Sequence, residues 1–431
     1  MIEALKNKEK KIAVVGLGYV GLPLALEFGR HFSVIAYDIN EVRVDLMKRD
    51  IDPSAELEAT AFEGVDVEFT AALELLAGAH IYIIAVPTPV DEHKVPNLGP
   101  LLSATKAVAK HLKERDYVIF ESTVYPGCTE EDCLPILETI SGLTCGTQFK
   151  IGYSPERINP GDKIRTLTKI IKIVSGSDEE ALETIAALYE TIIEPGVHRA
   201  PTIKVAEAAK IIENTQRDLN ISLMNELSII FDKMDIDTKS VLEAAGTKWN
   251  FLKFYPGLVG GHCIGVDPYY LLHKSREIGY DPQVILSGRR VNDSMPSFVA
   301  KKLTQLLIQK QKNPKDCKAL IMGITFKENV SDIRNSKISE LVKELHEFSI
   351  QTEVYDPYAS AEEVKEEYNI ELVESLSSDY DAIIIAVNHD RFEAYTMEKF
   401  VQLMSKSPII MDLKGMYERP SNESGISYWR L

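Results

Sequence analysis

The sequence predicts an α/β protein built from two Rossmann-like, doubly wound domains that are joined by a long central helix. A glycine-rich turn follows the first strand-like apolar run, a second series of such runs follows Asn313-Pro314, and residues 203–233 contain neither glycine nor proline. We therefore expect a first domain at residues 1–200, a helical middle domain at residues 201–312 and a second Rossmann-like domain at residues 313–431.

Composition and charge narrow the possible partners. The 431 residues include 65 acidic and 48 basic side chains, and the net charge of −17 argues against nucleic-acid binding. The apolar runs are too short to span a membrane, and residues 1–11 lack the apolar core of a signal peptide. Five cysteines without a compact disulfide framework predict reduced thiols in the cytoplasm. Cys128 and Cys133 lie too far from any other Cys/His pair to predict a zinc site, so no metal is expected.

The amino-terminal segment has the context that a dinucleotide-binding fingerprint requires. A strand at residues 11–15 runs into the glycine turn of residues 16–21, and a helix and a second strand at residues 33–38 follow. The first glycine makes the turn, the second admits the pyrophosphate and the third lets helix and strand pack. Asp38 ends the second strand, where a carboxylate binds ribose hydroxyls and repels a 2′-phosphate, which favours NAD over NADP. Arg43 fits either a place near the adenine or a solvated helix position. The NAD candidates here are Gly16, Gly18, Tyr19, Val20, Gly21, Asp38 and Arg43.

Two later strands end in turns that are rich in hydroxyl groups. The strand-like runs at residues 81–86 and 117–120 lead into Thr88 and Thr123. Because ligands of doubly wound sheets lie at the carboxyl ends of strands, both threonines are candidate cofactor contacts. Their alternative role is to cap the helices that follow.

The loop after a predicted strand at residues 149–153 presents Glu156 and Arg157. Two prolines and a glycine between residues 154 and 161 predict a rigid loop at a strand end. Glu156 is therefore a candidate site residue, although charged loop residues are as often only solvated.

The uninterrupted segment at residues 203–233 has apolar residues at helical spacing. It predicts one helix of about 30 residues, which spans about 45 Å at about 1.5 Å per residue. A helix of that length bridges domains or forms a dimer seam. Lys210 and Asn214 are four residues apart and share one face, where they could anchor an oxygen-rich ligand. A solvated lysine is the alternative for Lys210.

A loop at residues 260–268 holds two adjacent glycines, Cys263 and Asp267. Glycine lets backbone approach closely, a thiol beside it is placed to act as a nucleophile, and a carboxylate four residues on can handle protons. The alternative is a tight turn with a buried cysteine. An aromatic segment at residues 247–256 precedes the loop, and another helix is expected at residues 283–292.

The last third repeats the alternation of strands and helices without a GxGxxG motif. Lys327 and Arg334 follow the first strand of this part, where cationic side chains suit phosphates. The polar segment from Ser421 onward is expected to fray. The strand-like runs lie at residues 317–322, 352–356, 381–387 and 408–411.

Taken together, seven motifs resemble the UDP-glucose/GDP-mannose dehydrogenase family over almost the whole chain. The similarity is greatest to the branch that acts on UDP-N-acetylhexosamines, as in O-antigen and Vi-type capsule pathways. In chain order the motifs are Gly16-Leu-Gly-Tyr-Val-Gly21, Val86-Pro-Thr-Pro89, Ser122-Thr-Val, Ser154-Pro-Glu156, Ala206-Glu-Ala-Ala-Lys210 with Asn214-Thr215, Gly260-Gly-His-Cys263 with Asp267, and Phe326-Lys327 with Asp332 and Arg334.

The resemblance implies an enzyme that oxidises the C6 hydroxyl of a UDP-sugar twice, to a carboxylate, with two NAD, for surface polysaccharide synthesis. It implies an amino-terminal NAD domain, a carboxy-terminal UDP-sugar domain, and a homodimer or higher homo-oligomer built on the long helix. Chemistry supports the thiol, because Cys263 would convert the intermediate aldehyde to a thiohemiacetal, whose oxidation gives a thioester that water hydrolyses.

The same resemblance implies a role for each remaining site residue. Asp267 assists proton transfer, and Lys210 and Asn214 stabilise the oxyanion at C6. Glu156 and Thr123 match positions around the nicotinamide and the reacting water. Arg334 would meet the cofactor pyrophosphate, and the implied substrate contacts are Glu156, Arg157, Lys210, Asn214, Phe251, Lys253, Tyr255, Gly260, Arg290 and Lys327.

Two departures from the family pattern bear on the sugar. The UDP-glucose branch commonly has a lysine directly before the aspartate, where this chain has Val266, and a second glutamate after Ser-Pro-Glu is replaced near Pro160. UDP-N-acetylglucosamine or UDP-N-acetylgalactosamine is therefore expected, with UDP-glucose and UDP-N-acetylmannosamine as alternatives. A two-electron dehydrogenase of a β-hydroxyacid and a nucleotide-sugar sensor without activity are the competing classes.

Overall fold

The structure, a computed structural model, describes residues 1–54, 56–91, 93–158, 164–261, 264–421 and 424–431. The chain divides into two compact units. Unit 1 comprises Met1–Glu213 with Tyr269–Tyr280, and unit 2 comprises Asn214–Pro268 with Asp281–Leu431. The three domain boundaries expected from the sequence stay a prediction.

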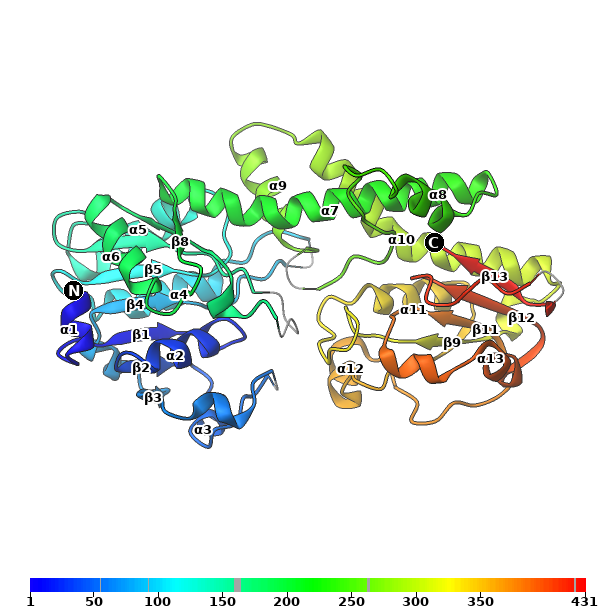
Figure 1. Cartoon of the computed structure of the whole chain (residues 1–431), viewed down its shortest axis with the longest axis horizontal. Coiled ribbons are helices and arrows are strands. Elements are labelled where there is room, and N and C mark those ends of the chain that lie inside the picture. Colours follow the sequence, from blue (N-terminus) through cyan, green and yellow to red (C-terminus); the bar gives the residue numbers. More distant parts are fainter. Residues whose placement is uncertain (55, 92, 159–163, 262–263, 422–423) are drawn as a thin grey trace. The chain divides into compact units, whose positions relative to one another are not determined.

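Unit 1 is built on an eight-stranded sheet with the order β3-β2-β1-β4-β5-β6-β7-β8 (Figure 1). Neighbouring strands are parallel except β6 and β7, which are antiparallel. The chain starts in the middle of the sheet and fills both sides, which is the predicted doubly wound arrangement. Of these strands, β3, β7 and β8 were not predicted. The strands are β1 Ile12–Val15, β2 Val34–Tyr37, β3 Val67–Thr70, β4 Ile81–Ile84, β5 Tyr117–Phe120, β6 Lys150–Tyr153, β7 Lys172–Gly176 and β8 Val197–Arg199.

Helices separate most of these strands and bury their apolar faces against the sheet. The core of unit 1 includes Val14 of β1 and Ile119 of β5, packed in one cluster with Leu24 and Phe28 of the second helix. The helices are α1 Ile2–Lys6, α2 Gly21–Gly29, α3 Glu41–Met47, α4 Gly99–Ala109, α5 Leu134–Ser141 and α6 Glu179–Tyr189.

Helix α7, Ile203–Lys233, is 31 residues long, so the prediction of a single uninterrupted helix is confirmed (the long green helix of Figure 1). Its first part belongs to unit 1 and its second part, from Asn214, belongs to unit 2.

Unit 2 is built on a five-stranded parallel sheet with the order β10-β9-β11-β12-β13. The predicted second Rossmann-like sheet is thus confirmed, and it has one more strand than the sequence predicted. Its strands are β9 Lys318–Met322, β10 Gln351–Tyr355, β11 Tyr380–Ile385, β12 Met404–Asp412 and β13 Ser427–Arg430. The remaining helices of the chain are α8 Thr238–Ala245, α9 Asp267–Glu277, α10 Gln283–Gln309, α11 Lys337–Glu347, α12 Ala361–Tyr368 and α13 Met397–Leu403.

One expected helix in this part of the chain is longer than predicted, and one expectation was wrong. The helix expected at residues 283–292 continues through Pro296 to Gln309, because apolar side chains on its later turns remain buried in the core of unit 2. Residues 427–430, in the segment that was expected to fray, form β13, which pairs with β12. Trp429 is only 9 % exposed, and its indole Nε1 donates to Asp232 Oδ1 at 2.7 Å. The polar composition of this segment gave no strand pattern, although its strand carries one large buried side chain, that of Trp429.

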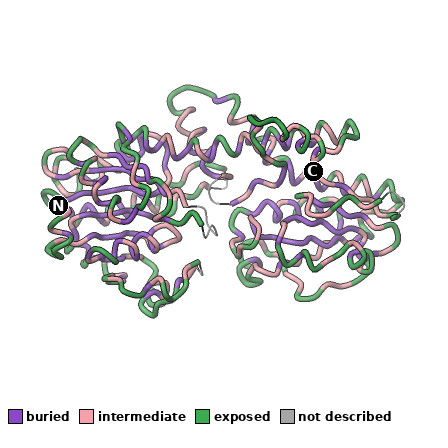
Figure 2. Tube along the Cα trace, in the orientation of Figure 1, coloured by how far each residue is buried: buried purple, intermediate pink, exposed green. Residues whose placement is uncertain are grey.

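The buried residues concentrate on the two sheets, whose strands are mostly purple in Figure 2. The strand runs are buried on both faces, as expected of parallel sheets that helices cover. No helix within the described ranges is both long enough and apolar enough to cross a membrane.

Candidate active site

The glycine turn after β1 shows why its glycines are needed. Gly16 has a φ of +91°, and a Cβ there would lie 2.8 Å from Val86 Cγ1. A Cβ on Gly21 would overlap the carbonyl oxygen of Gly16, so only glycine lets α2 begin this close to the turn. A Cβ on Gly18 would meet no atom within 4 Å. The backbone beside Gly18 is therefore open, which leaves room for a pyrophosphate.

Asp38 fastens this turn to the end of β2. Its carboxylate accepts hydrogen bonds from the backbone N–H groups of Leu17, at 2.8 Å, and Asn40, at 2.9 Å. Arg43 donates from Nη2 to the carbonyl oxygen of Leu17 at 3.1 Å, so its guanidinium lies beside the turn and is not simply solvated. The structure thus brings together the predicted NAD residues Gly16, Gly18, Tyr19, Val20, Gly21, Asp38 and Arg43.

Thr88 and Thr123 lie together at the ends of β4 and β5. The Thr88 hydroxyl donates to the carbonyl oxygen of Thr123 at 2.7 Å. Tyr270 of α9 donates from its hydroxyl to the carbonyl oxygen of Thr88 at 2.8 Å. Thr88 does not cap the next helix, since α4 begins after Leu98. Both threonines are therefore held at the carboxyl edge of the sheet, where the sequence placed a cofactor contact.

Glu156 is held by a cluster of charges inside unit 1. Its Oε1 accepts from the backbone N–H groups of Arg157, at 2.5 Å, and Ile158, at 2.6 Å. Its Oε2 lies 2.9 Å from Nζ of Lys172, which is fully buried on β7. The same ammonium lies 2.6 Å from Glu121, directly after β5. Glu156 is 6 % exposed, so the alternative of a merely solvated loop residue is wrong.

Burial and charge act against each other in this cluster. Burial raises the pKa of Glu121 to about 7, although the neighbouring Lys172 ammonium and the Tyr189 hydroxyl favour the ionised carboxylate. Burial would lower the pKa of Lys172, but Glu121 and Glu156 outweigh it and raise that pKa above its ordinary value. Lys172 and Glu121 were not predicted as site residues from the sequence. The available signal was a lysine at the start of an otherwise apolar strand-like run.

Arg157 is tied to unit 1 on both of its terminal nitrogens. Nη1 donates to the carbonyl oxygen of Ile171 at 2.7 Å, and Nη2 lies 2.7 Å from Glu213 Oε1 near the middle of α7. Arg157 therefore lies beside the Glu156 carboxylate, but its guanidinium is bonded to other groups of unit 1.

Lys210 and Asn214 occupy one side of α7, one turn apart, and are 7 % and 6 % exposed. The alternative of a solvated Lys210 is therefore wrong. Within unit 2, Nδ2 of Asn214 donates to Oδ2 of Asp267 at 2.5 Å. Asp267 is the first residue of α9 and is 2 % exposed. The structure thus joins two residues that lie far apart in the sequence and that the family pattern predicted to act together.

The backbone before the predicted nucleophile packs on unit 2 itself. A Cβ on Gly260 would lie 2.5 Å from the carbonyl oxygen of Asn335. Gly261 has a φ of +86°, and a Cβ there would lie 2.7 Å from the ring of Phe326. The close backbone approach that the two glycines predicted is therefore made to Asn335 and Phe326 of the same unit. Cys263, with His262, lies outside the described residues.

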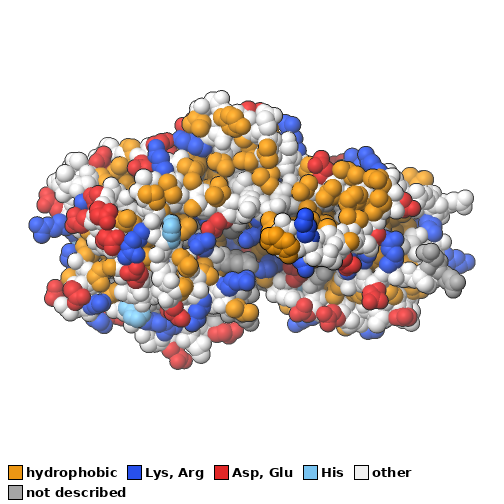
Figure 3. Space-filling view, turned by 45° about the horizontal axis from the view of Figure 1, so that its top comes forward, with side chains coloured by type: hydrophobic (Ala, Val, Ile, Leu, Met, Phe, Trp, Pro, Cys, Tyr) orange, Lys and Arg blue, Asp and Glu red, His pale blue; other side chains and the backbone are white. Residues whose placement is uncertain are grey.

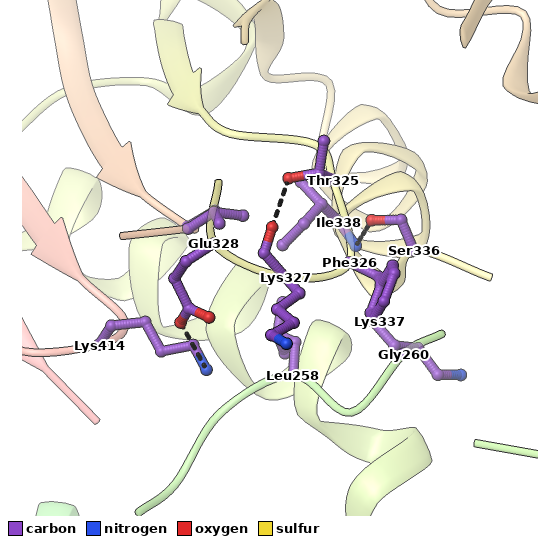
Figure 4. A pocket seen from close by; sticks show the side chains of 12 residues that line it. Leu258, Gly260, Thr325, Phe326, Lys327, Glu328, Ser336, Lys337, Ile338 and Lys414 are labelled. Atoms are coloured by element: carbon purple, nitrogen blue, oxygen red, sulfur yellow. Dashed lines mark hydrogen bonds and ion pairs between the residues drawn. The ribbon is translucent and has the colours of Figure 1, made fainter. Parts of the chain in front are cut away.

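Unit 2 has a pocket of about 300 Å³, including space open to solvent, at the carboxyl ends of its strands (Figure 4). It brings together two predicted substrate residues, Lys327 and Gly260. Lys414 reaches the same pocket and lies 3.9 Å from Glu328. The residues around the pocket are Leu258, Gly260, Thr325, Phe326, Lys327, Glu328, Ser336, Lys337, Ile338, Ala386, Val387 and Lys414.

The chemistry of this pocket favours an anion. It lies at the start of α11, where Ser336 is the N-cap and accepts from the Ile338 backbone N–H at 3.3 Å. The positive end of the helix dipole and the ammonium groups of Lys327 and Lys414 favour a phosphate there. The ammonium of Lys337 is paired with Glu340, at 2.6 Å, and Asp293, at 3.0 Å. Lys337 and Lys414 were missed, because each is an ordinary surface-type lysine in its own stretch of sequence.

The structure does not add the other predicted residues to this pocket. Tyr255 is 57 % exposed and Arg290 is exposed, while its neighbour Arg289 is buried and lies 2.5 Å from Asp218. The Arg334 side chain is 55 % exposed and forms a bidentate pair with Asp332. Phe251 is partly buried and Lys253 is exposed. Their roles stay predictions.

Three segments of the chain match models of one family. Residues 10–193 match the “UDP-glucose/GDP-mannose dehydrogenase family, NAD binding domain”. Residues 204–294 match the central domain of that family, and residues 320–419 match its UDP binding domain. The glycine turn lies in the first match, and most of the pocket residues lie in the third.

Named relatives are similar along their whole length. The chain is 50 % identical over 418 residues to the UDP-N-acetyl-D-glucosamine 6-dehydrogenase of Pseudomonas aeruginosa, covering 96 % of this chain and 99 % of the relative. It is 51 % identical over 420 residues to the enzyme of the same name from Salmonella typhi, covering 97 % and 98 %. The solved structure of a UDP-D-ManNAc dehydrogenase from Pyrococcus horikoshii superposes with a TM-score of 0.89 at 30 % identity, covering 97 % and 98 %.

Proposed function

Because the chain belongs to the UDP-glucose/GDP-mannose dehydrogenase family, we propose that this NAD-dependent dehydrogenase oxidises the C6 hydroxyl of UDP-N-acetylglucosamine to a carboxylate. One observation carries the choice of sugar: about half of all residues are identical, over nearly the full length, to two enzymes named for that substrate. UDP-N-acetylgalactosamine differs only in the direction of one hydroxyl and is the second candidate. The buried Val266, in place of a family lysine, supports a sugar other than UDP-glucose.

The residues of unit 1 suit the binding of NAD, which accepts a hydride from C6 in each of two oxidation steps. The open backbone at Gly18 would admit the pyrophosphate, and the Asp38 carboxylate would accept from the ribose hydroxyls. Thr88 and Thr123 would line the nicotinamide side at the ends of β4 and β5. Arg334 is proposed to meet the pyrophosphate.

The substrate chemistry is assigned to the family residues of α7 and of the cysteine loop. Asp267, held by Asn214, would take the proton of the C6 hydroxyl as the first hydride leaves. The Cys263 thiolate would then add to the aldehyde carbon, and Lys210 and Asn214 would stabilise the oxyanion of the thiohemiacetal. Loss of the second hydride leaves a thioester, and water attacks its carbonyl carbon to release the carboxylic acid and regenerate the thiol. Glu156 would accept a proton from that water.

A homodimer or higher homo-oligomer built on α7 is the proposed assembly. Val205, Ile212, Leu223 and Ile230 are 45 %, 56 %, 50 % and 43 % exposed, and their spacings of 7, 11 and 7 residues return to one face of the helix. Hydrophobic side chains gather on the side of the molecule that Figure 3 brings forward. A second copy would remove this stripe from water. Leu223→Glu should shift the mass in light scattering toward the monomer, and Lys233→Glu is the control.

A cytoplasmic location and a place in surface polysaccharide synthesis belong to the same proposal. Both rest on the family resemblance, and the first also on four described cysteines that form no disulfide. UDP-sugars are made and consumed where such thiols stay reduced.

The deciding experiment is a panel of UDP-sugars assayed for NADH. UDP-N-acetylglucosamine should give about two NADH per sugar and a uronic acid product. Cys263→Ala should stop before the acid, while Cys145→Ala, at a partly buried thiol of unit 1, should not. Preference for UDP-glucose would overturn the sugar, and one NADH per turnover without a need for Cys263 would support a simple two-electron dehydrogenase. Binding of both ligands without NADH would support a sensor.

A further inference from the structure

We propose that His389 is a positioning residue for the UDP pocket: its imidazole holds the pocket-lining segment 325–328 in place. The proposal rests on the proposed function, because the pocket is taken to bind the uridine diphosphate part of the substrate.

The segment 325–328 forms one wall of the pocket and carries Lys327 (Figure 4). Its start is held by Asp356, which follows β10. Asp356 Oδ2 accepts from the backbone N–H groups of Ile324, at 2.7 Å, and Thr325, at 3.2 Å. Its end is held by His389, whose Nδ1 accepts from the backbone N–H of Asn329 at 3.0 Å. Asp356 and His389 thus hold the two ends of the wall. Two further hydrogen bonds add to them, from Phe326 N to the carbonyl oxygen of Asp332 at 3.1 Å and from Asp390 N to Asn329 Oδ1 at 3.0 Å.

The contacts of His389 decide where its proton lies. The Asn329 backbone N–H can only donate, so Nδ1 carries no proton and Nε2 carries one. Nε2 lies 3.1 Å from Asp356 Oδ2 and 3.2 Å from Thr325 Oγ1. The Thr325 hydroxyl donates its own proton to the carbonyl oxygen of Lys327 at 2.9 Å, which leaves its oxygen free to accept from Nε2. Every donor among these groups therefore faces an acceptor.

Burial makes these bonds hard to replace. His389 is fully buried and Asp356 is 8 % exposed. The Tyr358 ring lies 4.8 Å from the imidazole, with Arg391 at 5.0 Å from that ring, and the Phe392 ring lies 5.1 Å from the imidazole. Loss of the acceptor at Nδ1 would take this partner from the Asn329 backbone N–H.

A comparison of the two turns shows how unit 2 uses its carboxylate differently. In unit 1, Gly16 N donates to Tyr37 O at 2.8 Å and Leu17 N donates to Asp38 at 2.8 Å. In unit 2, Gly323 N donates to the carbonyl oxygen of Tyr355 at 2.8 Å, and Ile324 N donates to Asp356 at 2.7 Å. Asp356 is the carboxylate of unit 2 that corresponds to Asp38. It contacts the imidazole of His389 at 3.1 Å, so in unit 2 this carboxylate helps to order the pocket wall.

The test measures UDP-sugar binding by calorimetry in the full chain, with His389→Leu and His389→Asn. Leucine removes the acceptor for the Asn329 N–H, and the dissociation constant of UDP-N-acetylglucosamine and of UDP-glucose should rise about tenfold, the effect of one lost buried hydrogen bond. Asparagine keeps an oxygen acceptor where Nδ1 lies, so the affinity of this variant should match that of the wild type. Binding of NAD should be unchanged in both variants.

Rescue by asparagine separates positioning from a merely structural role. A positioning role predicts weaker binding of both UDP-sugars in His389→Leu, nearly wild-type binding in His389→Asn and unchanged NAD binding in both. Unchanged affinity in His389→Leu, or equal losses in the two variants, would overturn the proposal. Binding needs no turnover. A protein that shows this pattern yet forms no NADH would overturn the proposed activity and leave the role of His389 intact.

Discussion

The ammonium of Lys172 lies 2.9 Å from the carboxylate of Glu156, with both side chains buried in unit 1. The contact joins β7 to the loop after β6, the one place in this sheet where neighbouring strands run antiparallel. The same ammonium forms an ion pair with a second carboxylate, that of Glu121, at 2.6 Å. The loop that carries a predicted catalytic residue is thus anchored by a buried cation.

Removal of that cation should destabilise unit 1. Lys172→Met leaves Glu121 and Glu156 buried without a counter-charge, and breaking a buried ion pair costs about 3–5 kcal/mol. The midpoint of urea unfolding should fall accordingly. Lys169→Met is the matched control, because its pair with Glu194 is exposed, and it should change little. Equal effects of the two variants would contradict the role assigned to the buried cluster.

Glu207 should make stability depend on pH. Its carboxylate accepts from the backbone N–H groups of Gly127, at 2.6 Å, and Thr129, at 2.9 Å, and burial raises its pKa from 4.5 to about 7. The folded state then binds the proton more tightly than the unfolded state. Stability from this group is full below pH 4.5 and falls as the pH rises to about 7, by up to about 3 kcal/mol.

Glu207→Gln should remove most of this slope. The measurement is urea unfolding between about pH 5 and about pH 7.5, where the variant should change less than the wild type. Glu194→Gln, at an exposed site, is the control and should keep the wild-type slope. A slope that survives in Glu207→Gln would assign it to other groups, with Glu121 as the first to examine.

Alanine substitutions at Gly18 and Gly21 should have different effects, the first on NAD affinity and the second on stability. Gly18→Ala meets no protein atom, so thermal stability should be nearly unchanged while NAD affinity falls by about tenfold or more, because the Cβ enters the space for the pyrophosphate. Gly21→Ala overlaps the Gly16 carbonyl oxygen and should lower the unfolding temperature itself. Gly78→Ala, whose Cβ would make only one ordinary contact, at 3.5 Å to Ile35, is the control. Unchanged NAD affinity in Gly18→Ala would place the cofactor elsewhere.

Asp267→Asn should lower kcat by about 10²–10⁴-fold if the carboxylate accepts the C6 proton. The hydrogen bond with Asn214 can re-form with an amide, so the fold should survive. NADH formation under saturating substrate checks the rate, and calorimetry should find NAD binding unchanged. Asp235→Asn, at an exposed position, is the control. A variant with the wild-type rate would move the proton acceptor to another group.

Much of the fold followed from the sequence, because its signals are local. The apolar run of β1, the glycine turn before α2 and the absence of breakers in α7 each act within a few residues of themselves. The misses were of another kind. Strand β7 begins with a lysine, and β13 lies in a polar tail, so neither has the pattern of a buried strand. Partners elsewhere in the fold supply what the pattern lacks, namely two carboxylates for Lys172 and a core for Trp429.

By itself the sequence determined two Rossmann-like sheets, the long helix and the NAD turn, and it named the candidate site residues, since each depends on short-range spacing and on chemistry that a side chain carries with it. Only the tertiary structure decided which distant groups meet. It joined Asn214 to Asp267, and Lys327 to Gly260 in one pocket. It also raised the pKa of Glu121 to about 7 and placed a backbone donor against Nδ1 of His389, because burial and the direction of a neighbouring donor are properties of the folded chain.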